Sequence, residues 1–302
     1  MDLNERADRM RRIAARCGGR HPGELLCVHP IAPAVFERLR YTAAGYMSRC
    51  LPAAPVITDE AILLSRFRES VDELKNLTPN GVIVPKRETI LEYNVFARAV
   101  VDVIARLGID DLAGSWRVPL NLRWKGPRAS ESQVRRPYAT ERLHTDAWAG
   151  EHPDGITMLI PVFGDAEATR VEFFTPPPDF HASWLHPLES YARGEELARR
   201  YRRLEVPFQL GHAYLFDMAM FHQTVRRGNG GPRVSVDTVL LPPAGVAPAG
   251  DANHPKPSVE HADLLGLGEE WLFVFGGSLR EWREDAAPAS QPPRPSFTIA
   301  RL

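Results

Sequence analysis

Two histidines and an aspartate have the residue types and the spacing that a metal site requires. His144 and Asp146 lie two positions apart in RLHTDAWAG, and His222 lies far downstream in FHQTV. Side chains two residues apart point to the same side of an extended chain, so we expect ERLHTDAW to be a strand. Two neutral imidazoles and one carboxylate form the facial ligand set of non-haem Fe(II), which leaves other positions open for exchangeable ligands. We therefore predict that these three residues bind iron and are catalytic.

The His-x-Asp pattern alone is weak evidence, because the sequence contains it three times. His152 and Asp154 flank a proline in EHPDG, which is typical of a turn with a solvated imidazole. His261 and Asp263 lie in VEHADLLGL, which resembles a helix start, where an aspartate serves as a cap or an early-helix charge. Only the copy in RLHTDAWAG is followed by a histidine and then by Arg-x-Ser. Taken by itself, that copy could also be a strand-edge pair satisfied by its neighbours.

The segment FHQTVRRGNGGPRVSVDTVLL carries His222 and then Arg233 and Ser235. Arg233 and Ser235 project to one face of a strand, and we expect the turn RRGNGGP to place this strand beside the one that carries His222. A guanidinium binds a carboxylate through two charge-assisted hydrogen bonds, and a hydroxyl adds a third. The sequence therefore predicts a site for a dicarboxylic acid whose other end reaches the metal. A surface ion pair is the alternative for Arg233, while Arg226 and Arg227 fall in the turn and are expected to face solvent.

Composition narrows the class of partner. The chain has 302 residues with 37 basic and 38 acidic side chains, a net charge of −1, which offers no broad basic field for nucleic acid. We expect a small-molecule substrate and no nucleic acid, and either a monomer or a homodimer. No apolar run resembles a signal peptide or a membrane span, and three widely spaced cysteines suggest neither disulfides nor a thiolate metal site. These features favour a cytoplasmic protein without a membrane partner.

The pattern of apolar residues and the local composition divide the chain into three regions. Apolar residues three and four positions apart predict a helical N-terminal region over 1–115 that packs on the core. Its expected helices are 5–17, 33–50, 59–77 and 88–109. The last of these has apolar residues that we place on one side, namely Leu91, Val95, Phe96, Ala99, Val103 and Leu107. Residues 242–302 form a C-terminal extension whose Pro- and Ala-rich parts we expect to be partly flexible.

The middle region, 116–241, reads as short strands between turns. The expected strands are SWRVPLNLRW, ATERLHTDAW, GITMLIPVF, RVEFFTP, HAYLFDM, FHQTV and RVSVDTVLL. An insertion at 176–207 interrupts them, and its central part, 188–204, has a helical pattern. Short antiparallel strands at this spacing favour a mainly β fold with flanking helices, with a jelly-roll or cupin-like core.

The ordered set His144-Thr-Asp146, His222, Arg233 and Ser235 resembles the pattern of the Fe(II)/2-oxoglutarate-dependent oxygenase superfamily. The resemblance covers roughly residues 116–241, and the helical region before a double-stranded β-helix core is similar to the superfamily's plan. HTDAWAG, followed by a Pro-Asp-Gly turn and an apolar strand, is similar to bacterial oxygenases of secondary metabolism, including those of aminoglycoside and sugar-derived antibiotics.

The resemblance implies a reaction. His144, Asp146 and His222 would hold Fe(II), and 2-oxoglutarate would chelate it while its distal carboxylate rests against Arg233 and Ser235. Reaction with O2 would convert this cosubstrate to succinate and CO2 and oxidise a C–H bond of the substrate. Asp146 argues against halogenation, because related halogenases leave its position small. Hydroxylation is the default outcome, and the motif does not choose among desaturation, epoxidation, ring closure and epimerisation.

Other residues are weaker candidates for the site. Asn121 and Arg123, on the strand before the His-x-Asp pair, are candidate contacts for the cosubstrate or a polar substrate. Trp148 would share the strand face of Asp146 and line the pocket, with core packing as its alternative. Within the insertion, His181 and Trp184, together with His186, are candidate substrate contacts if the insertion is a lid, and otherwise pack it against the core.

Two other classes of protein remain open. One is a non-catalytic jelly-roll or cupin-like module that binds a small ligand or carbohydrate, with its histidines packed in the core. The other is a cupin-type metal enzyme that uses no 2-oxo acid, although such sites usually carry three or four histidines. The Arg-x-Ser strand favours the oxygenase over both.

Overall fold

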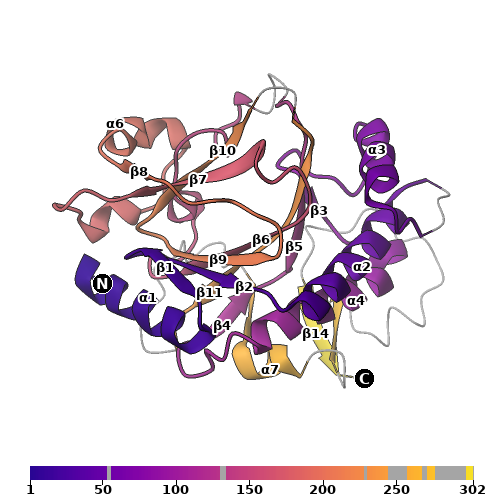
Figure 1. The fold of residues 1–302 in the computed structure, drawn as a ribbon, viewed down its shortest axis with the longest axis horizontal. Helices are drawn as coiled ribbons and strands as arrows, with labels where there is room; N and C mark the ends of the chain where they lie inside the picture. Colours follow the sequence, from indigo (N-terminus) through magenta and orange to yellow (C-terminus); the bar gives the residue numbers. More distant parts are fainter. Residues whose placement is uncertain are drawn as a thin grey trace.

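Antiparallel β-sheets form the centre of the computed structural model, and helices cover one side of the larger sheet (Figure 1). The structure describes residues 1–52, 56–129, 134–227, 230–243, 257–266, 271–275 and 297–301. The Pro-rich stretch 244–256 and most of the tail that we expected to be flexible lie outside these residues. Among the described residues, no helix is long and apolar enough to cross a membrane.

The larger sheet has the order β1-β2-β9-β6-β11-β4-β12, with β5 pairing with β11 and β3 pairing with β5. Its strands are β1 (Arg20–Gly23), β2 (Leu26–Pro30), β3 (Val82–Ile83), β4 (Ser115–Arg117), β5 (Asn121–Lys125), β6 (Ile156–Gly164), β9 (His212–Asp217), β11 (Arg233–Leu241) and β12 (Ser258–Glu260). Strands β6 and β11 are almost wholly buried because side chains pack on both of their faces. This central pair is the rigid support on which the site is built.

A smaller sheet has the order β10-β7-β8, formed by β7 (Thr169–Thr175), β8 (Arg202–Leu204) and β10 (Phe221–Arg226). It packs face to face on the larger sheet, since the ring of Phe173 on β7 contacts Tyr214 and Phe216 on β9. An isolated antiparallel bridge between His144 and His222 continues the smaller sheet beyond β10. A separate pair, β13 (Trp271–Phe275) and β14 (Phe297–Arg301), lies near the C-terminus.

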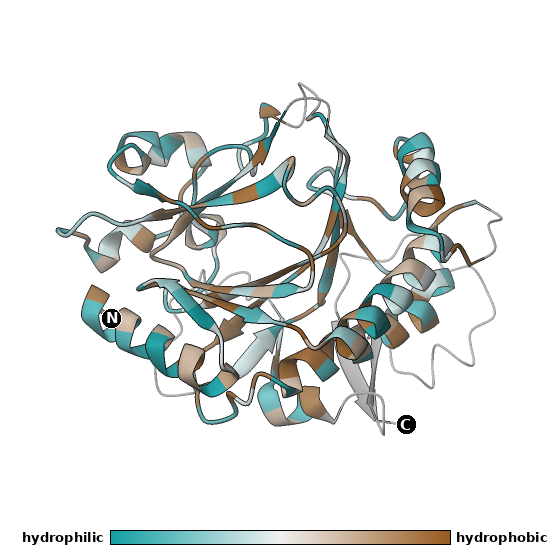
Figure 2. Ribbon diagram, viewed as in Figure 1, coloured by the Kyte–Doolittle hydropathy of each residue, from teal (hydrophilic) through white to brown (hydrophobic). Residues whose placement is uncertain are grey.

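The helices lie outside the larger sheet. The α-helices are α1 (Leu3–Cys17), α2 (Pro33–Cys50), α3 (Glu60–Ser70), α4 (Ile90–Ala105), α6 (Glu195–Ala198) and α7 (His261–Leu265), and the 3-10 helices are η1 (Arg87–Thr89), η2 (Asp146–Ala149), η3 (Ala182–Leu185) and η4 (Tyr191–Gly194). Helices α2 and α4 pack side by side (Figure 1). Their apolar faces bury a core with Leu122, Trp124 and Val236 of the sheet. Figure 2 shows that both helices carry hydrophobic and hydrophilic residues.

Helix α1 is fixed to the sheets by a buried ionic network. Arg6 and Asp217 have no exposed side-chain surface, and Arg6 pairs with Asp217 at 2.8 Å and with Asp154 at 2.7 Å. Arg9 donates to the other oxygen of Asp217 at 2.5 Å. The turn expected at EHPDG is present, and its Asp154 is buried in an ion pair with Arg6. His261, in the third His-x-Asp copy, accepts a hydrogen bond from Trp116 Nε1 at 2.8 Å and has a structural role.

Several expected elements are confirmed, and others are not. Helix α2 and strand β11 have the predicted bounds, 33–50 and 233–241. The stretch 139–148 is not a strand, because only His144 forms a bridge and Asp146 begins η2. The predicted helix over 188–204 contains only η4 and α6, and β8 follows them. The N-terminal region also contributes β1, β2 and β3 to the larger sheet, which its helical pattern did not indicate.

Two predictions about packing were wrong. Strand β10 pairs with β7, whereas β11 pairs with β5 and β6, so the turn between β10 and β11 connects two sheets rather than two neighbours. In α4, Leu91 and Val95 are 59% and 58% exposed. They lie on the outer side, and the buried face is formed by residues such as Tyr93, Phe96 and Val100.

Candidate metal centre

His144, Asp146 and His222 converge, with one ligand atom from each lying within 4.8 Å of the others. The Nε2 atoms of His144 and His222 lie 3.9 Å and 3.8 Å from Asp146 Oδ1. Ligands about 2.0–2.2 Å from one ion lie roughly 3–4 Å apart, so the three atoms can hold a single metal ion. The chain brings them together by a different route from the expected strand, since the backbones of His144 and His222 pair directly at 3.1 Å and 2.8 Å.

Two of the three ligand side chains, those of His144 and Asp146, are oriented by hydrogen bonds. His144 Nδ1 lies 2.7 Å from the carbonyl oxygen of Arg142, so a proton on Nδ1 leaves Nε2 free for a metal. The imidazole also stacks on Tyr191 with ring centres 4.1 Å apart. Thr157 on β6 donates to Asp146 Oδ2 at 2.9 Å, which turns Oδ1 toward the two imidazoles. These contacts prepare the donor atoms before a metal arrives.

Burial keeps both histidines neutral. Burial, and then the neighbouring His222, lower the pKa of His144 to about 3. Burial also lowers the pKa of His222, against the opposing effect of Asp146. Neutral imidazole is the form that binds a metal, so neither ligand needs to lose a proton at neutral pH.

Arg233 and Ser235 lie on the inner face of β11, toward the smaller sheet. Arg233 is 1% exposed, and it donates to the carbonyl oxygen of Thr169 on β7 at 2.9 Å. Its Nε atom and the Ser235 hydroxyl are buried without a hydrogen-bond partner. Burial lowers the pKa of Arg233 to about 9. Unsatisfied buried donors are costly, so this pair of groups is suited to accept a polar ligand.

Asn121 and Arg123 lie on the same inner face, one strand away on β5. Both bind Asp237, which sequence reasoning did not single out: Asn121 donates to Oδ1 at 3.0 Å and Arg123 Nε donates to Oδ2 at 2.7 Å. The guanidinium of Arg123 also donates to the carbonyl oxygen of Asn80 at 3.2 Å. The charge of Arg123 is thus compensated by Asp237 within the protein.

A cavity of about 500 Å³ opens beside Asp146. The polar and aromatic residues of its lining include Asn121, Arg123, Asp237, Arg117, Glu151, Thr140, Thr157, Tyr138 and Tyr191. Arg117 and Glu151 pair at 2.9 Å, as Arg123 and Asp237 do at 2.7 Å. The cavity therefore presents paired charges, hydroxyls and two aromatic rings next to the metal ligands.

The remaining candidates lie elsewhere. Trp148 is 1% exposed and donates from Nε1 to the carbonyl oxygen of Trp184 at 2.8 Å, so it packs in the core. Trp184 packs on Phe180, and Arg200 lies over its ring. His181 and His186 are exposed and bind Ser183. None of these four residues lines the cavity beside Asp146.

The insertion does contribute to the site, through a residue that we did not predict. Tyr191 in η4 stacks on His144 and lines the cavity. It lies in LESYARG, whose helical pattern gave no sign of a site role. Thr157 also escaped notice, because a threonine on an apolar strand reads as ordinary strand sequence.

No family model and no curated protein matches the chain. Among solved structures, it is similar to the α-ketoglutarate-dependent epimerase SnoN of nogalamycin biosynthesis, with 16% identity over 72% of this chain and 88% of SnoN and a TM-score of 0.37. It is also similar to AviO1 from Streptomyces viridochromogenes Tue57, with 15% identity over 83% of this chain and 99% of AviO1 and a TM-score of 0.41. A third similar structure is an N-substituted L-amino acid dioxygenase from Burkholderia ambifaria AMMD in complex with α-ketoglutarate, with 12% identity, 76% and 87% coverage and a TM-score of 0.37.

Proposed function

We propose that the protein is a non-haem Fe(II) oxygenase that couples oxidative decarboxylation of 2-oxoglutarate to hydroxylation, or a related C–H oxidation, of a small polar metabolite. The observation that carries the proposal is the convergence of His144, Asp146 and His222 within 4.8 Å. Two imidazoles and one carboxylate suit an iron that must keep positions open, whereas structural zinc sites use four protein ligands. We place the reaction in bacterial natural-product or sugar-derivative biosynthesis, following the resemblance of the HTDAWAG segment.

The strand order supports the expected double-stranded β-helix. Four strands in the order β5-β11-β6-β9 face the bridge at His144 and the strands β10, β7 and β8. In this arrangement both sheets contribute inner-facing side chains to the space between them, Arg233 from one and His222 from the other.

Arg233 and Ser235 are the residues that we assign to the distal carboxylate of 2-oxoglutarate. Their unpartnered Nε and Oγ atoms are buried, and a carboxylate would accept hydrogen bonds from both. The guanidinium is anchored at Thr169, four positions along β7 from Phe173, which pairs with His222. Four strand residues, from Thr169 to Phe173, span about 13 Å. The side chains of Arg233 and His222, with a five-carbon diacid between them, are long enough to fill this length. Asn121 and Arg123, which both bind Asp237, would then lie between the cosubstrate and the substrate.

When bound, the iron and 2-oxoglutarate would supply the oxidising power for O2-dependent cleavage of a C–H bond. The protein's own residues hold and orient. His144 and His222 present neutral Nε2 atoms, Thr157 fixes the Asp146 carboxylate, and Tyr191 covers the His144 ring and shields it from water. The cavity beside Asp146 would place the substrate, and its paired charges and hydroxyls favour a polar, hydrogen-bonding molecule over an apolar one.

The test is anaerobic reconstitution with Fe(II) and 2-oxoglutarate, followed by visible absorption. We expect the weak charge-transfer band of an iron-chelated keto acid in the parent protein, and no band in His144→Ala or Asp146→Ala. His181→Ala is the matched control, since this exposed histidine lies outside the cavity, and it should keep the band. A second readout is succinate formed from 2-oxoglutarate under air.

A parent protein that takes up no Fe(II) and gives no band at saturating 2-oxoglutarate would favour the non-catalytic cupin-like module. A parent that binds Fe(II) but not 2-oxoglutarate would favour a cupin-type metal enzyme. The two results separate the alternatives, because Fe(II) uptake tests His144, Asp146 and His222, whereas 2-oxoglutarate binding tests Arg233.

A further inference from the structure

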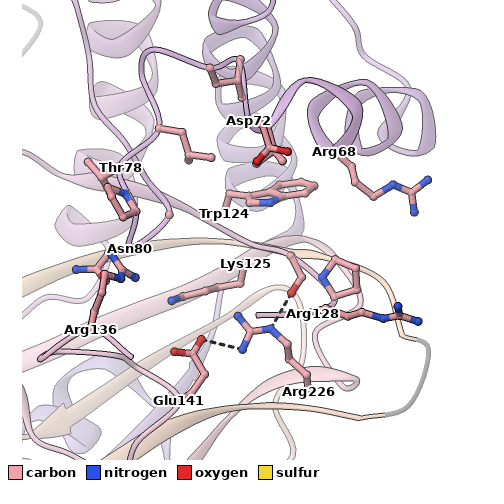
Figure 3. Close-up of a pocket in the computed structure, with 17 residues that line it drawn as sticks. Arg68, Asp72, Thr78, Asn80, Trp124, Lys125, Arg128, Arg136, Glu141 and Arg226 are labelled. Atoms are coloured by element: carbon pink, nitrogen blue, oxygen red, sulfur yellow. Dashed lines mark hydrogen bonds and ion pairs between the residues drawn. The ribbon is translucent and has the colours of Figure 1, made fainter. Parts of the chain in front are cut away.

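A second cavity, of about 440 Å³, lies at the end of β5 away from Asp146 (Figure 3). None of the three candidate metal ligands lines it, and neither does Arg233. Basic side chains predominate in its lining, namely Arg68, Lys125, Arg128, Arg136 and Arg226. The acidic side chains of the lining are Asp72 and Glu141. The cavity therefore carries an excess of positive charge.

The innermost cations share one carboxylate. Arg226 pairs with Glu141 at 2.8 Å and also donates to the carbonyl oxygen of Gly126, as the dashed lines in Figure 3 mark. Lys125 donates to the Thr140 hydroxyl at 2.6 Å, a neutral partner. Arg136 has a buried Nε without a hydrogen-bond partner, and it has no ion pair with any residue that the structure describes. Glu141 pairs with Arg226 and also attracts Lys125 and Arg136, so one carboxylate faces three cations and does not neutralise them all.

The cost of this arrangement is visible at Lys125, which is 6% exposed. Burial, and then the positive charges of Arg123, Arg233 and Arg226, lower its pKa to about 7 against the opposing effect of Glu141. A negatively charged ligand placed beside the amine would reverse this effect, since an opposite charge nearby favours the protonated form. The geometry and the electrostatics thus agree on the sign of the missing partner.

Apolar side chains line the cavity as well. Leu74, Leu77 and Trp124 line it, and Figure 3 shows the Trp124 ring above the Lys125 side chain. We propose that this cavity is a binding site for a small organic anion, with its phosphate or carboxylate beside Arg136 and Lys125 and its apolar part against Leu74, Leu77 and Trp124. A guanidinium and an ammonium are suited to either acidic group.

This anion site is distinct from the position that we assign to 2-oxoglutarate. The two cavities share Asn80 in their linings, and the contact between Lys125 and Thr140 lies between them, since Lys125 lines one and Thr140 lines the other. The proposal does not depend on metal binding or on turnover. It can therefore be tested on the metal-free protein.

The experiment is isothermal titration calorimetry of the full chain, without metal, against phenyl phosphate, benzoate, phenol and inorganic phosphate. We expect phenyl phosphate or benzoate to bind and phenol not to bind. Arg136→Gln should lower the affinity for the anion by about 10- to 100-fold, because one charge-assisted contact is lost. Arg11→Gln on α1 is the matched control, because this side chain is 60% exposed and outside the cavity, and it should leave binding unchanged.

A second variant changes the affinity in the opposite direction. Glu141→Gln removes the carboxylate that competes with the ligand, so it should tighten anion binding by several-fold if the site is as described. Binding of neither acidic probe, equal binding of phenol, or equal affinity in Arg136→Gln and the parent would overturn the proposal. If inorganic phosphate binds as tightly as phenyl phosphate, the proposed contact between the apolar part of the ligand and Trp124 is wrong.

Affinity for 2-oxoglutarate in the presence of Fe(II) is the last arm. Arg136→Gln should leave it unchanged, and an equal loss of both affinities would mean that the cavity is only an extension of the cosubstrate position, which contradicts the proposal. Anion binding in a protein that never binds 2-oxoglutarate would uphold this site and refute only the oxygenase function.

Discussion

Replacing Lys125 with methionine should make the stability of the metal-free protein less dependent on pH. The amine of Lys125 is buried against Thr140, and its pKa falls from 10.5 to about 7 in the folded state, first because of burial and then because of the nearby Arg123. Methionine keeps most of the side-chain volume and removes the charge. The change therefore isolates the cost of a buried, protonated lysine.

The magnitude follows from the shift. Each pKa unit corresponds to ~1.4 kcal/mol, so a fall from 10.5 to about 7 means that protonated Lys125 costs roughly 5 kcal/mol. Between these two pH values the unfolded chain binds the proton and the folded chain has released it, so the free energy of unfolding rises with pH. The penalty is fully present below pH 7 and is relieved as the pH approaches 10.5. From pH 7 to pH 9.5 this one group should contribute about 3 kcal/mol of added stability.

Urea denaturation of both proteins at pH 6.5, 7.5, 8.5 and 9.5 measures this contribution, because other titrating groups cancel in the difference between variant and parent. We expect Lys125→Met to be the more stable protein at pH 6.5 and to lose about 3 kcal/mol of that advantage by pH 9.5. Lys75→Met, at an exposed position, is the control and should show no such trend. A stability difference that stays constant over this pH range would refute the reasoning, since it would mean that the folded amine keeps its proton at no cost.

Three further predictions concern single contacts. Arg233→Gln should weaken 2-oxoglutarate binding by about 2–5 kcal/mol in titration calorimetry, because a buried carboxylate would lose its charged partner, whereas Arg227→Gln should have little effect. Asp217→Asn should lower the free energy of unfolding by about 3–5 kcal/mol in urea, since it leaves Arg6 and Arg9 buried without their carboxylate. Trp148→Ala should cost about 3–5 kcal/mol in the same assay through the cavity it leaves in the core, and a loss below 1 kcal/mol would argue that Trp148 faces a pocket after all.

Local sequence patterns were sufficient for the elements that are buried on a repeating face. Strand β11 was predicted at its observed bounds because RVSVDTVLL alternates and is flanked by turn residues. The apolar spacing of 33–50 gave α2 for the same reason. In α4 the pattern was ambiguous, since Leu91 and Val95 are apolar but lie on the exposed side. Periodicity predicts that a helix forms and does not by itself decide which apolar stripe is covered.

Pairing between distant segments was not predictable from local pattern. A glycine turn between two strands normally makes a hairpin, yet β10 and β11 lie in different sheets, where β10 pairs with β7 and β11 pairs with β6. Strands β1 and β2 are short, and their sequences RHPG and LCVHP lack a clear alternation. Their place in the sheet depends on β9, far away in the chain.

For the candidate site, the sequence predicted the residues but not the geometry that brings them together. Residue type and order were enough to select His144, Asp146 and His222, which the structure brings together, because the chemistry of a facial triad allows few residue types. The geometry that joins them was predicted incorrectly, since η2 rather than a strand presents Asp146. Tyr191 and Thr157 were missed because they act through contacts with the ligands and carry no metal-binding chemistry of their own.

The unsatisfied polar atoms explain why the site is best understood as a binding site. Arg233 Nε and Ser235 Oγ are both buried without a partner, and both residues lie on β11, which borders the space between the sheets. Each such group costs roughly 1–3 kcal/mol, a large amount beside the total stability of a domain. A purely structural interior would gain by replacing them with apolar side chains of similar shape. A ligand that accepts these hydrogen bonds recovers that cost, and it must therefore stabilise the folded chain as it binds.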